Sequence, residues 1–217
     1  MKDYKYILFD LDGTISDPKV GITKSVAYAL NYFQIETEDL NNLCKFIGPP
    51  LKDSFIEYYG FNDEEADLAV AKYREYYAVK GIYENTIYNG IEELMQNLKA
   101  RHKVLIVATS KPIVYATKIL EHFKLLQYFD FISGSELNGE RTKKSEVIEY
   151  ALKQNNIDDL PSVIMIGDRE HDINGAVKTG IDSIGILYGY GNKDEFERAG
   201  ASFIVGSVKD LEYFLIG

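Results

Sequence analysis

The chain has 217 residues, of which 46 % are hydrophobic and 27 % are charged. This length and balance exclude a disordered or fibrous chain and suit one large domain or one domain with a sizeable insertion. The 34 acidic residues outnumber the 24 basic ones, and the formal charge of -10 argues against a nucleic acid or an anionic membrane as partner.

Cysteine content and hydropathy indicate the compartment. The single cysteine, Cys44, excludes an intrachain disulfide and fits a reducing environment. No apolar run approaches the roughly 18 residues that a membrane span needs, and the opening letters "MKDYKYILFDLDG" are too short and too acidic for a signal peptide. We therefore expect a cytoplasmic protein, either a monomer or a weak dimer.

The first predicted element is a strand in "YKYILF", residues 4–9. This run is short, apolar and rich in aromatic and β-branched residues, which favours a strand covered on both faces over an amphipathic helix. From residue 16 to residue 88 the pattern is helical, so 16–88 is predicted to be a helical insertion. Within it, "FIGPPL" (46–51) breaks a helix, and the next helix is predicted to begin at Asn62 or Asp63.

Beyond the insertion, strand and helix patterns alternate. Residues 90–98 and 145–154 each carry apolar side chains at helical spacing. Short apolar runs predict four more strands, at 104–109, 163–167, 183–187 and 202–205. This alternation is typical of an α/β protein whose parallel sheet is wrapped by helices. We predict a Rossmann-like core at 1–15 and 89–217, with the inserted α-helical domain at 16–88.

Acidic, hydroxyl and basic residues follow the predicted strands, at the edge where a parallel sheet binds its ligands. In chain order they are Asp10 and Asp12, Thr109 and Ser110, Lys144 at a helix start, and Asp168 and Asp172. Four carboxylates in one crevice repel one another strongly unless a cation lies between them, and oxygen ligands of this kind suit Mg²⁺. The sequence therefore predicts a magnesium site.

The first two aspartates are placed for two different tasks. Alternation along an extended segment points Asp10 and Asp12 to the same side. One carboxylate can attack phosphorus while the other protonates the leaving oxygen and later takes a proton from water. Gly13 then lets the chain turn and lets backbone N–H groups approach an anion closely.

A phosphoryl group fits the remaining side chains. Such a group needs a cation, backbone donors, a hydroxyl and an ammonium around its oxygens. Thr109 offers the hydroxyl, Ser110 a backbone N–H near a helix start, and Lys144 the ammonium.

Four ordered motifs, "DLDGT", "VATSKP", "KSEVI" and "GDREHDI", resemble those of the haloacid dehalogenase superfamily of phosphatases. The insertion after the first motif is similar to the helical cap of the phosphoglycolate phosphatase and 5'-nucleotidase branches. The resemblance covers nearly the whole chain. It implies a Mg²⁺-dependent phosphatase that hydrolyses a small phosphomonoester, a nucleoside 5'-monophosphate or phosphoglycolate, through an aspartyl phosphate.

The resemblance also implies residue roles. Asp10 would be the nucleophile, and Asp12 would be the general acid and base, whose backbone carbonyl also meets the metal. Asp168 would ligate Mg²⁺ directly, and Asp172 would ligate it or hold a water. The predicted phosphate-binding residues are Asp12, Gly13, Thr109, Ser110 and Lys144, and the predicted metal-binding residues are Asp10, Asp12, Asp168 and Asp172.

Two further assignments depend on position alone. Lys143 adjoins Lys144, and we prefer Lys144 because the family lysine stands where its helix begins. The cap is expected to choose the leaving group through residues near its helix break, namely Ile47, Gly48, Pro49 and Lys52.

Other functions stay open. A sugar-phosphate mutase similar to β-phosphoglucomutase would pass the phosphoryl group to a second hydroxyl, and an inorganic pyrophosphatase of the same superfamily would differ in its leaving group. A phospho-acceptor signalling domain also combines aspartates, a hydroxyl and a lysine around Mg²⁺, but it has no use for an acid two residues beyond the acceptor. We expect a small phosphorylated metabolite as partner, and neither nucleic acid nor membrane.

Overall fold

The computed structural model describes residues 2–217, which divide into two compact units. The first unit contains the residues up to Asp17 together with Ile87–Gly217, and the second is Pro18–Thr86. The sequence places the limits of the insertion at residues 16 and 88. Among the described residues, no helix has both the length and the apolar character of a membrane span.

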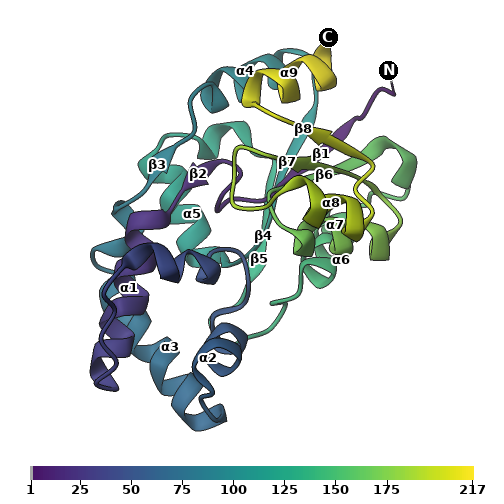
Figure 1. Cartoon of the computed structure of the whole chain (residues 1–217). Helices are drawn as coiled ribbons and strands as arrows, with labels where there is room; N and C mark the ends of the chain where they lie inside the picture. The colour runs from purple at the N-terminus through teal and green to yellow at the C-terminus, as the bar shows by residue number, and fades with distance from the viewer. Residues whose placement is uncertain (1) are drawn as a thin grey trace. The chain divides into compact units, whose positions relative to one another are not determined.

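The first unit is built on a six-stranded parallel sheet with the strand order β5-β4-β1-β6-β7-β8 (Figure 1). Its strands are β1 (Tyr6–Phe9), β4 (Val104–Pro112), β5 (Phe131–Ser135), β6 (Val163–Gly167), β7 (Asp182–Ile186) and β8 (Phe203–Val205). The predicted α/β fold and all five predicted strands are confirmed. The strand β5 was not predicted, and β4 continues to Pro112 instead of ending at Thr109.

Helices connect these strands, as parallel pairing requires. They are α4 (Ile91–Ala100), α5 (Ile113–His122), α6 (Lys144–Gln154), α7 (Glu170–Thr179), α8 (Lys193–Ala199) and α9 (Val208–Ile216), with 3₁₀ turns η3 (Leu126–Tyr128) and η4 (Leu160–Ser162). Helix α6 packs on α7, and α4 packs on α9. In Figure 1, α6, α7 and α8 lie to the right of the sheet and α5 lies to its left.

The central strand β1 is covered on both faces. Ile7, Leu8 and Phe9 have no exposed surface, which explains their continuous apolar run. Leu8 belongs to a core that also contains Ile106 of β4 and Met165 of β6. Burying one such side chain stabilises the fold by about 1.5–3 kcal/mol.

The second unit is helical, with α1 (Lys19–Tyr32), η1 (Leu40–Phe46), α2 (Leu51–Tyr59), α3 (Asp63–Tyr77) and η2 (Gly81–Tyr83). At the two limits of this unit in the sequence, the short strands β2 (Ser16–Asp17) and β3 (Thr86–Ile87) pair with each other. The predicted start of α3 is confirmed. Asn62 accepts a hydrogen bond from the N–H of Glu65, whose side chain accepts one from the N–H of Asn62.

Candidate active site

The candidate site lies in the first unit, where three neighbouring strands end. Strand β1 pairs with β4 on one side and with β6 on the other. Asp10 follows β1, and its N–H donates to the carbonyl of Ile166 in β6 at 2.9 Å. Asp168 follows β6, and Thr109 lies towards the end of β4. The parallel pairing therefore brings residues from distant parts of the sequence to one edge of the sheet.

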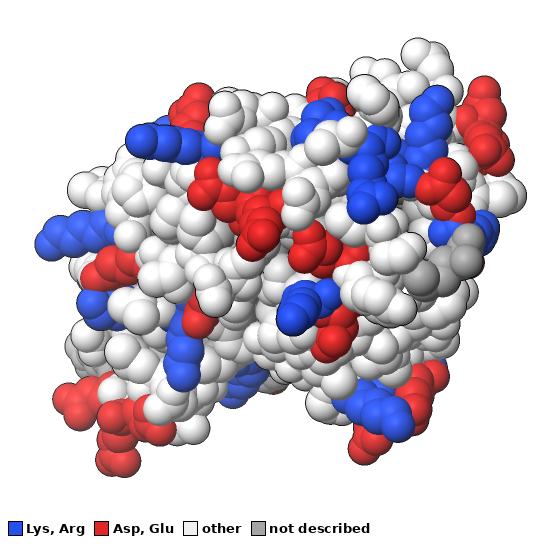
Figure 2. All heavy atoms as spheres, turned by 90° about the horizontal axis from the view of Figure 1, so that it is seen from above, with Lys and Arg blue, Asp and Glu red and all other residues white. Residues whose placement is uncertain are grey.

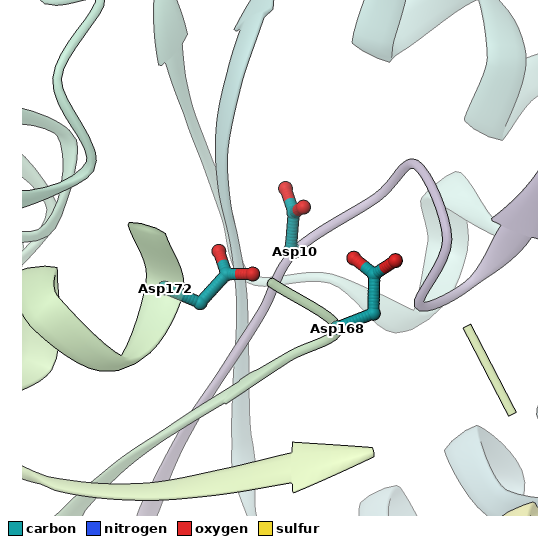
Figure 3. A group of neighbouring side chains, drawn as sticks. All are labelled: Asp10, Asp168 and Asp172. Carbon is teal, nitrogen blue, oxygen red and sulfur yellow. The ribbon is translucent and has the colours of Figure 1, made fainter. Parts of the chain in front are cut away.

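Three aspartates form a buried acidic cluster at this edge (Figure 3). Asp10, Asp168 and Asp172 each offer one carboxylate oxygen, and these oxygens all lie within 4.8 Å of one another. The two strand ends carry Asp10 and Asp168, and the first turn of α7 carries Asp172. Their exposed fractions are 4 %, 0 % and 1 %.

Burial and repulsion between carboxylates raise the pKa values of Asp168 and Asp172. Burial, with repulsion from Asp172 and Asp10, raises the pKa of Asp168 well above its usual range. Burial also raises the pKa of Asp172 to about 6, although Lys144 opposes the shift. The cluster therefore resists carrying three negative charges without a cation.

The donor set fits Mg²⁺. Oδ2 of Asp168 accepts a hydrogen bond from the N–H of Tyr190 at 2.8 Å. Oδ1 of Asp168 is buried and has no hydrogen-bond partner within the described residues. An unsatisfied buried carboxylate oxygen is costly, and a hard cation that prefers oxygen ligands would satisfy it. The carboxylate of Asp12 is not part of this cluster, and the predicted contact of its backbone carbonyl with the metal stays a prediction.

Lys144 neutralises part of the cluster. Its Nζ lies 2.7 Å from Oδ1 of Asp10 and 2.8 Å from Oδ1 of Asp172, and it donates to the carbonyl of Ala108 at 3.0 Å. Burial alone would lower the pKa of Lys144, but the two carboxylates outweigh it and raise that pKa above its ordinary value. The ammonium therefore stays charged beside Asp10. Lys143 is exposed, so the structure brings Lys144 to the site instead.

Asp12 forms an ion pair with a second lysine, Lys111. Its Oδ2 lies 2.8 Å from Nζ of Lys111, and the two side chains are only 11 % and 7 % exposed. Burial raises the pKa of Asp12, and Lys111 opposes the shift. Sequence reasoning missed Lys111. The signal that could have found it is alternation, which points Thr109 and Lys111 to the same side of an extended segment.

The predicted hydroxyl, Thr109, is 2 % exposed, and its Oγ1 accepts a hydrogen bond from the N–H of Lys111 at 3.2 Å. The helix start predicted near Ser110 is not found there. Strand β4 continues past Ser110, and α5 starts three residues later, at Ile113. The carbonyl of Ser110 accepts a hydrogen bond from Oγ of Ser135 in β5 at 2.8 Å. Pairing with β5 thus keeps this segment extended.

Gly13 stands where only glycine fits. Its φ is +83°, and a Cβ there would lie 2.1 Å from Oδ2 of Asp168. The N–H of Gly13 donates to the carbonyl of Ser16 at 2.7 Å, which closes the turn after Asp12. Its predicted part in phosphate binding stays a prediction.

A loop that sequence reasoning left without a function also reaches the site. We call residues 187–191, "LYGYG", the tyrosine loop. The hydroxyl of Tyr188 donates to the carbonyl of Thr14 at 3.1 Å, and Tyr190 holds Asp168 through its N–H. A Cβ on Gly189 would lie 2.3 Å from Cβ of Asp168. The loop therefore packs directly against a predicted metal ligand.

The residues predicted to choose the leaving group lie in the second unit. Ile47 is fully buried there, and Gly48 has a φ of +104°. Nζ of Lys52 lies 3.2 Å from Asp63 and 3.0 Å from Asp67. Contact of these residues with a substrate stays a prediction.

Residues 7–186 match the family model of haloacid dehalogenase-like hydrolases. The chain is 47 % identical over 192 residues to a 5'-nucleotidase of Pseudomonas aeruginosa, covering 88 % of this chain and 86 % of that protein. It is 34 % identical over 199 residues to the tyrosine-protein kinase PtkA of Mycobacterium tuberculosis, covering 91 % and 67 %. It is 25 % identical over 219 residues to a phosphoglycolate phosphatase of Colwellia psychrerythraea, covering 97 % and 96 %.

A solved structure is similar over the whole length. The crystal structure of a predicted phosphatase from Clostridium acetobutylicum matches with a TM-score of 0.96 and 52 % sequence identity, and the match covers 99 % of each chain.

Proposed function

The chain belongs to the haloacid dehalogenase-like hydrolase family and is a phosphatase of that family, and we propose that it releases phosphate from a nucleoside 5'-monophosphate with Mg²⁺ as cofactor. One observation carries the proposal. Asp10 lies in a buried cluster with Asp168, Asp172 and Lys144, and Asp12 stands two residues further along the chain.

The chain's residues would divide the work around the phosphoryl group. Asp10, Asp168 and Asp172 would hold Mg²⁺, which would offset negative charge on the phosphoryl oxygens. Lys144 and Thr109 would bind those oxygens through an ammonium and a hydroxyl. This arrangement lets a dianion approach a carboxylate that would otherwise repel it.

In the first half of the reaction, a carboxylate oxygen of Asp10 attacks phosphorus. The bond between this oxygen and phosphorus forms as the bond from phosphorus to the leaving oxygen breaks. Asp12 gives its proton to the leaving oxygen, so the nucleoside departs with a neutral hydroxyl. Burial raises the pKa of Asp12, a direction that suits a proton donor.

In the second half, a water attacks the aspartyl phosphate. Asp12, now a carboxylate, takes a proton from that water as the new bond to phosphorus forms. The bond between phosphorus and Asp10 breaks, inorganic phosphate leaves, and both aspartates return to their starting states.

Sequence identity favours a nucleotide over phosphoglycolate as substrate. The 5'-nucleotidase relative is 47 % identical, whereas the phosphoglycolate phosphatase relative is 25 % identical. The net charge of -10 and the interspersed acidic and basic side chains on the face in Figure 2 also support a small metabolite rather than a polyanion. We further propose that the second unit is a cap that contacts the leaving group through Ile47, Gly48, Pro49 and Lys52.

Phosphate release from a substrate panel tests the proposal. The panel contains nucleoside 5'-monophosphates, phosphoglycolate, a sugar phosphate, pyrophosphate and 4-nitrophenyl phosphate, each with Mg²⁺ and with a chelator. We expect Mg²⁺-dependent release, fastest from a nucleotide, that Asp10→Asn abolishes and that Asp53→Asn, a change at an exposed aspartate, leaves intact.

Each contrary result has a definite meaning. Faster release from phosphoglycolate or pyrophosphate would overturn the choice of substrate. Isomer formation from a sugar phosphate without net phosphate release would indicate a mutase. Full activity in Asp10→Asn would overturn the assignment of the nucleophile.

A further inference from the structure

The proposed mechanism gives no task to the ammonium of Lys111, whose side chain is only 7 % exposed. We propose that Lys111 is a positioning residue for leaving-group protonation, which holds Asp12 in place and stabilises the carboxylate that Asp12 becomes when it gives up its proton. This inference rests on the proposed function, because it assigns Lys111 through the acid role of Asp12.

Backbone contacts of β4 fix the position of Lys111 at the site. The register between β4 and β5 shifts between Ala108 and Pro112, which is an irregularity of the kind that re-aims side chains beside active sites. The N–H of Lys111 donates to Oγ1 of Thr109. A Cβ on Gly134 of β5 would lie 2.8 Å from the carbonyl oxygen of Lys111, so the two backbones approach closely. These contacts fix the segment from which the lysine side chain extends.

The two lysines at the site form ion pairs with different aspartates. Lys144 lies between Asp10 and Asp172, whereas Lys111 lies 2.8 Å from Asp12. A buried ammonium or carboxylate is strongly unfavourable without a partner of opposite charge. Each lysine thus faces different aspartates, and we assign the two lysines different tasks.

The contact also distinguishes the two oxygens of Asp12. Oδ2 faces the ammonium of Lys111, while Oδ1 is buried and has no hydrogen-bond partner among residues 2–217. We assign the transferable proton to Oδ1. When that proton passes to the leaving oxygen and the bond from phosphorus to this oxygen breaks, negative charge develops on Asp12 beside a cation that is already in place.

This role predicts a selective effect on substrates. A nucleoside leaves as a poor alkoxide unless its oxygen is protonated, whereas 4-nitrophenol leaves readily as the phenolate. A group that assists proton donation therefore accelerates the nucleotide reaction far more than the aryl reaction. A group that only binds the phosphoryl oxygens, or only maintains the fold, would affect both substrates alike.

The experiment compares kcat/KM for adenosine 5'-monophosphate and for 4-nitrophenyl phosphate in Lys111→Met and wild type. The constant kcat/KM is used because it includes only the steps up to and including departure of the leaving group. We expect Lys111→Met to lower it about 100-fold for the nucleotide and less than about 5-fold for the aryl phosphate, within the range of general-acid effects. Lys111→Arg should recover part of the nucleotide activity.

Two further variants keep the result interpretable. Lys118→Met changes an exposed lysine of α5 and should match wild type on both substrates. Lys111→Gln keeps a hydrogen-bond donor without the charge, and it replaces Lys111→Met if circular dichroism shows that the methionine variant is unfolded. The glutamine variant should show the same selective loss.

Several outcomes would overturn the inference. An equal loss of kcat/KM on both substrates would make Lys111 a phosphate-binding or structural residue. Unchanged kcat/KM for the nucleotide would show that Lys111 takes no part in protonation of the leaving group. If wild type releases phosphate only from another alkyl phosphomonoester, that compound replaces the nucleotide in the comparison. Failure of wild type to hydrolyse any compound would instead overturn the proposed function.

Discussion

Asp168 shows how the requirements of the site and of stability oppose each other at a single residue. Its carboxylate is fully buried beside Asp10 and Asp172, and one of its oxygens has no hydrogen-bond partner within the described chain. Its pKa rises well above the usual 3.8. Between the unfolded and folded pKa values, the folded protein binds more protons than the unfolded chain, so the free energy of unfolding falls as pH rises.

We therefore predict that Asp168→Asn stabilises the metal-free protein. The amide oxygen can still accept the N–H of Tyr190, but the variant carries no charge to be repelled. With a chelator at pH 7.5, the Tm should rise by a few degrees, which corresponds to about 1–2 kcal/mol at this chain length. The difference from wild type should shrink as the pH is lowered towards 5, because the proton that Asp168 takes up on folding then costs less free energy.

Magnesium should reverse this order. A ligand at 100 times its Kd stabilises the folded state by about 2.7 kcal/mol, and wild type should gain this while Asp168→Asn gains little. Thermal melts across pH, with a chelator and with Mg²⁺, measure both effects. If Asp168→Asn has a lower Tm than wild type at every pH in chelator, then the favourable contacts of the Asp168 carboxylate outweigh its repulsion by Asp10 and Asp172.

Among the elements, the tyrosine loop requires glycine at position 189. A Cβ on Gly189 would lie 2.3 Å from Cβ of Asp168 and 2.5 Å from the carbonyl oxygen of Gly13. Gly189→Ala must therefore move the loop, Asp168 or the turn after β1. We expect it to lower kcat/KM about 100-fold, because small displacements of reacting groups are costly, and to raise the Mg²⁺ concentration needed for half activity.

The matched control is Gly206→Ala, where a new Cβ would meet a single side-chain atom at 3.3 Å. That variant should keep both its kcat/KM and its Mg²⁺ requirement. Titration of activity with Mg²⁺ in the three proteins provides the measurement. An unchanged Mg²⁺ requirement in Gly189→Ala would show that the tyrosine loop does not position Asp168.

The elements also show what sequence patterns can predict. Runs such as "VIMIG" predict their strands because every side chain is buried in apolar surroundings. Strand β5, "FISGS", was missed because its buried end consists of small and polar residues. Ser133 and Ser135 are buried there only because their hydroxyls donate to the carbonyls of Val147 and Ser110. Those partners come from α6 and β4, so no local pattern contains them.

The same reasoning applies to the candidate site. Carboxylates at strand ends could be proposed from the sequence, because a parallel sheet brings its strand ends together whatever the loops do. Lys111 was not proposed, because a lysine is ordinarily solvated and this one is buried only through the register of β4 against β5. The tyrosine loop was likewise missed, because its hold on Asp168 is a backbone N–H that any residue except proline could supply.

At the scale of the whole molecule, the proposed cap role predicts that the nucleotide contacts both units and the metal only the first. The acidic cluster belongs entirely to the first unit, and the predicted leaving-group contacts, Ile47 to Lys52, belong to the second. Ligand binding slows amide exchange in the segments that it stabilises. Hydrogen exchange can therefore assign the metal and the nucleotide to their units separately.

We predict a two-step protection pattern in Asp10→Asn, which lacks the nucleophile but keeps a side-chain oxygen that can ligate the metal. Mg²⁺ alone should slow exchange in the tyrosine loop and the first turn of α7, and leave 46–52 unchanged. Adding adenosine 5'-monophosphate should then slow exchange within 46–52, where Pro49 and Pro50 have no amide and the signal comes from their neighbours. The first turn of α3, which Asn62 caps, is the internal reference. Protection of the tyrosine loop at saturating nucleotide without any change at 46–52 would show that the predicted cap residues do not contact the leaving group.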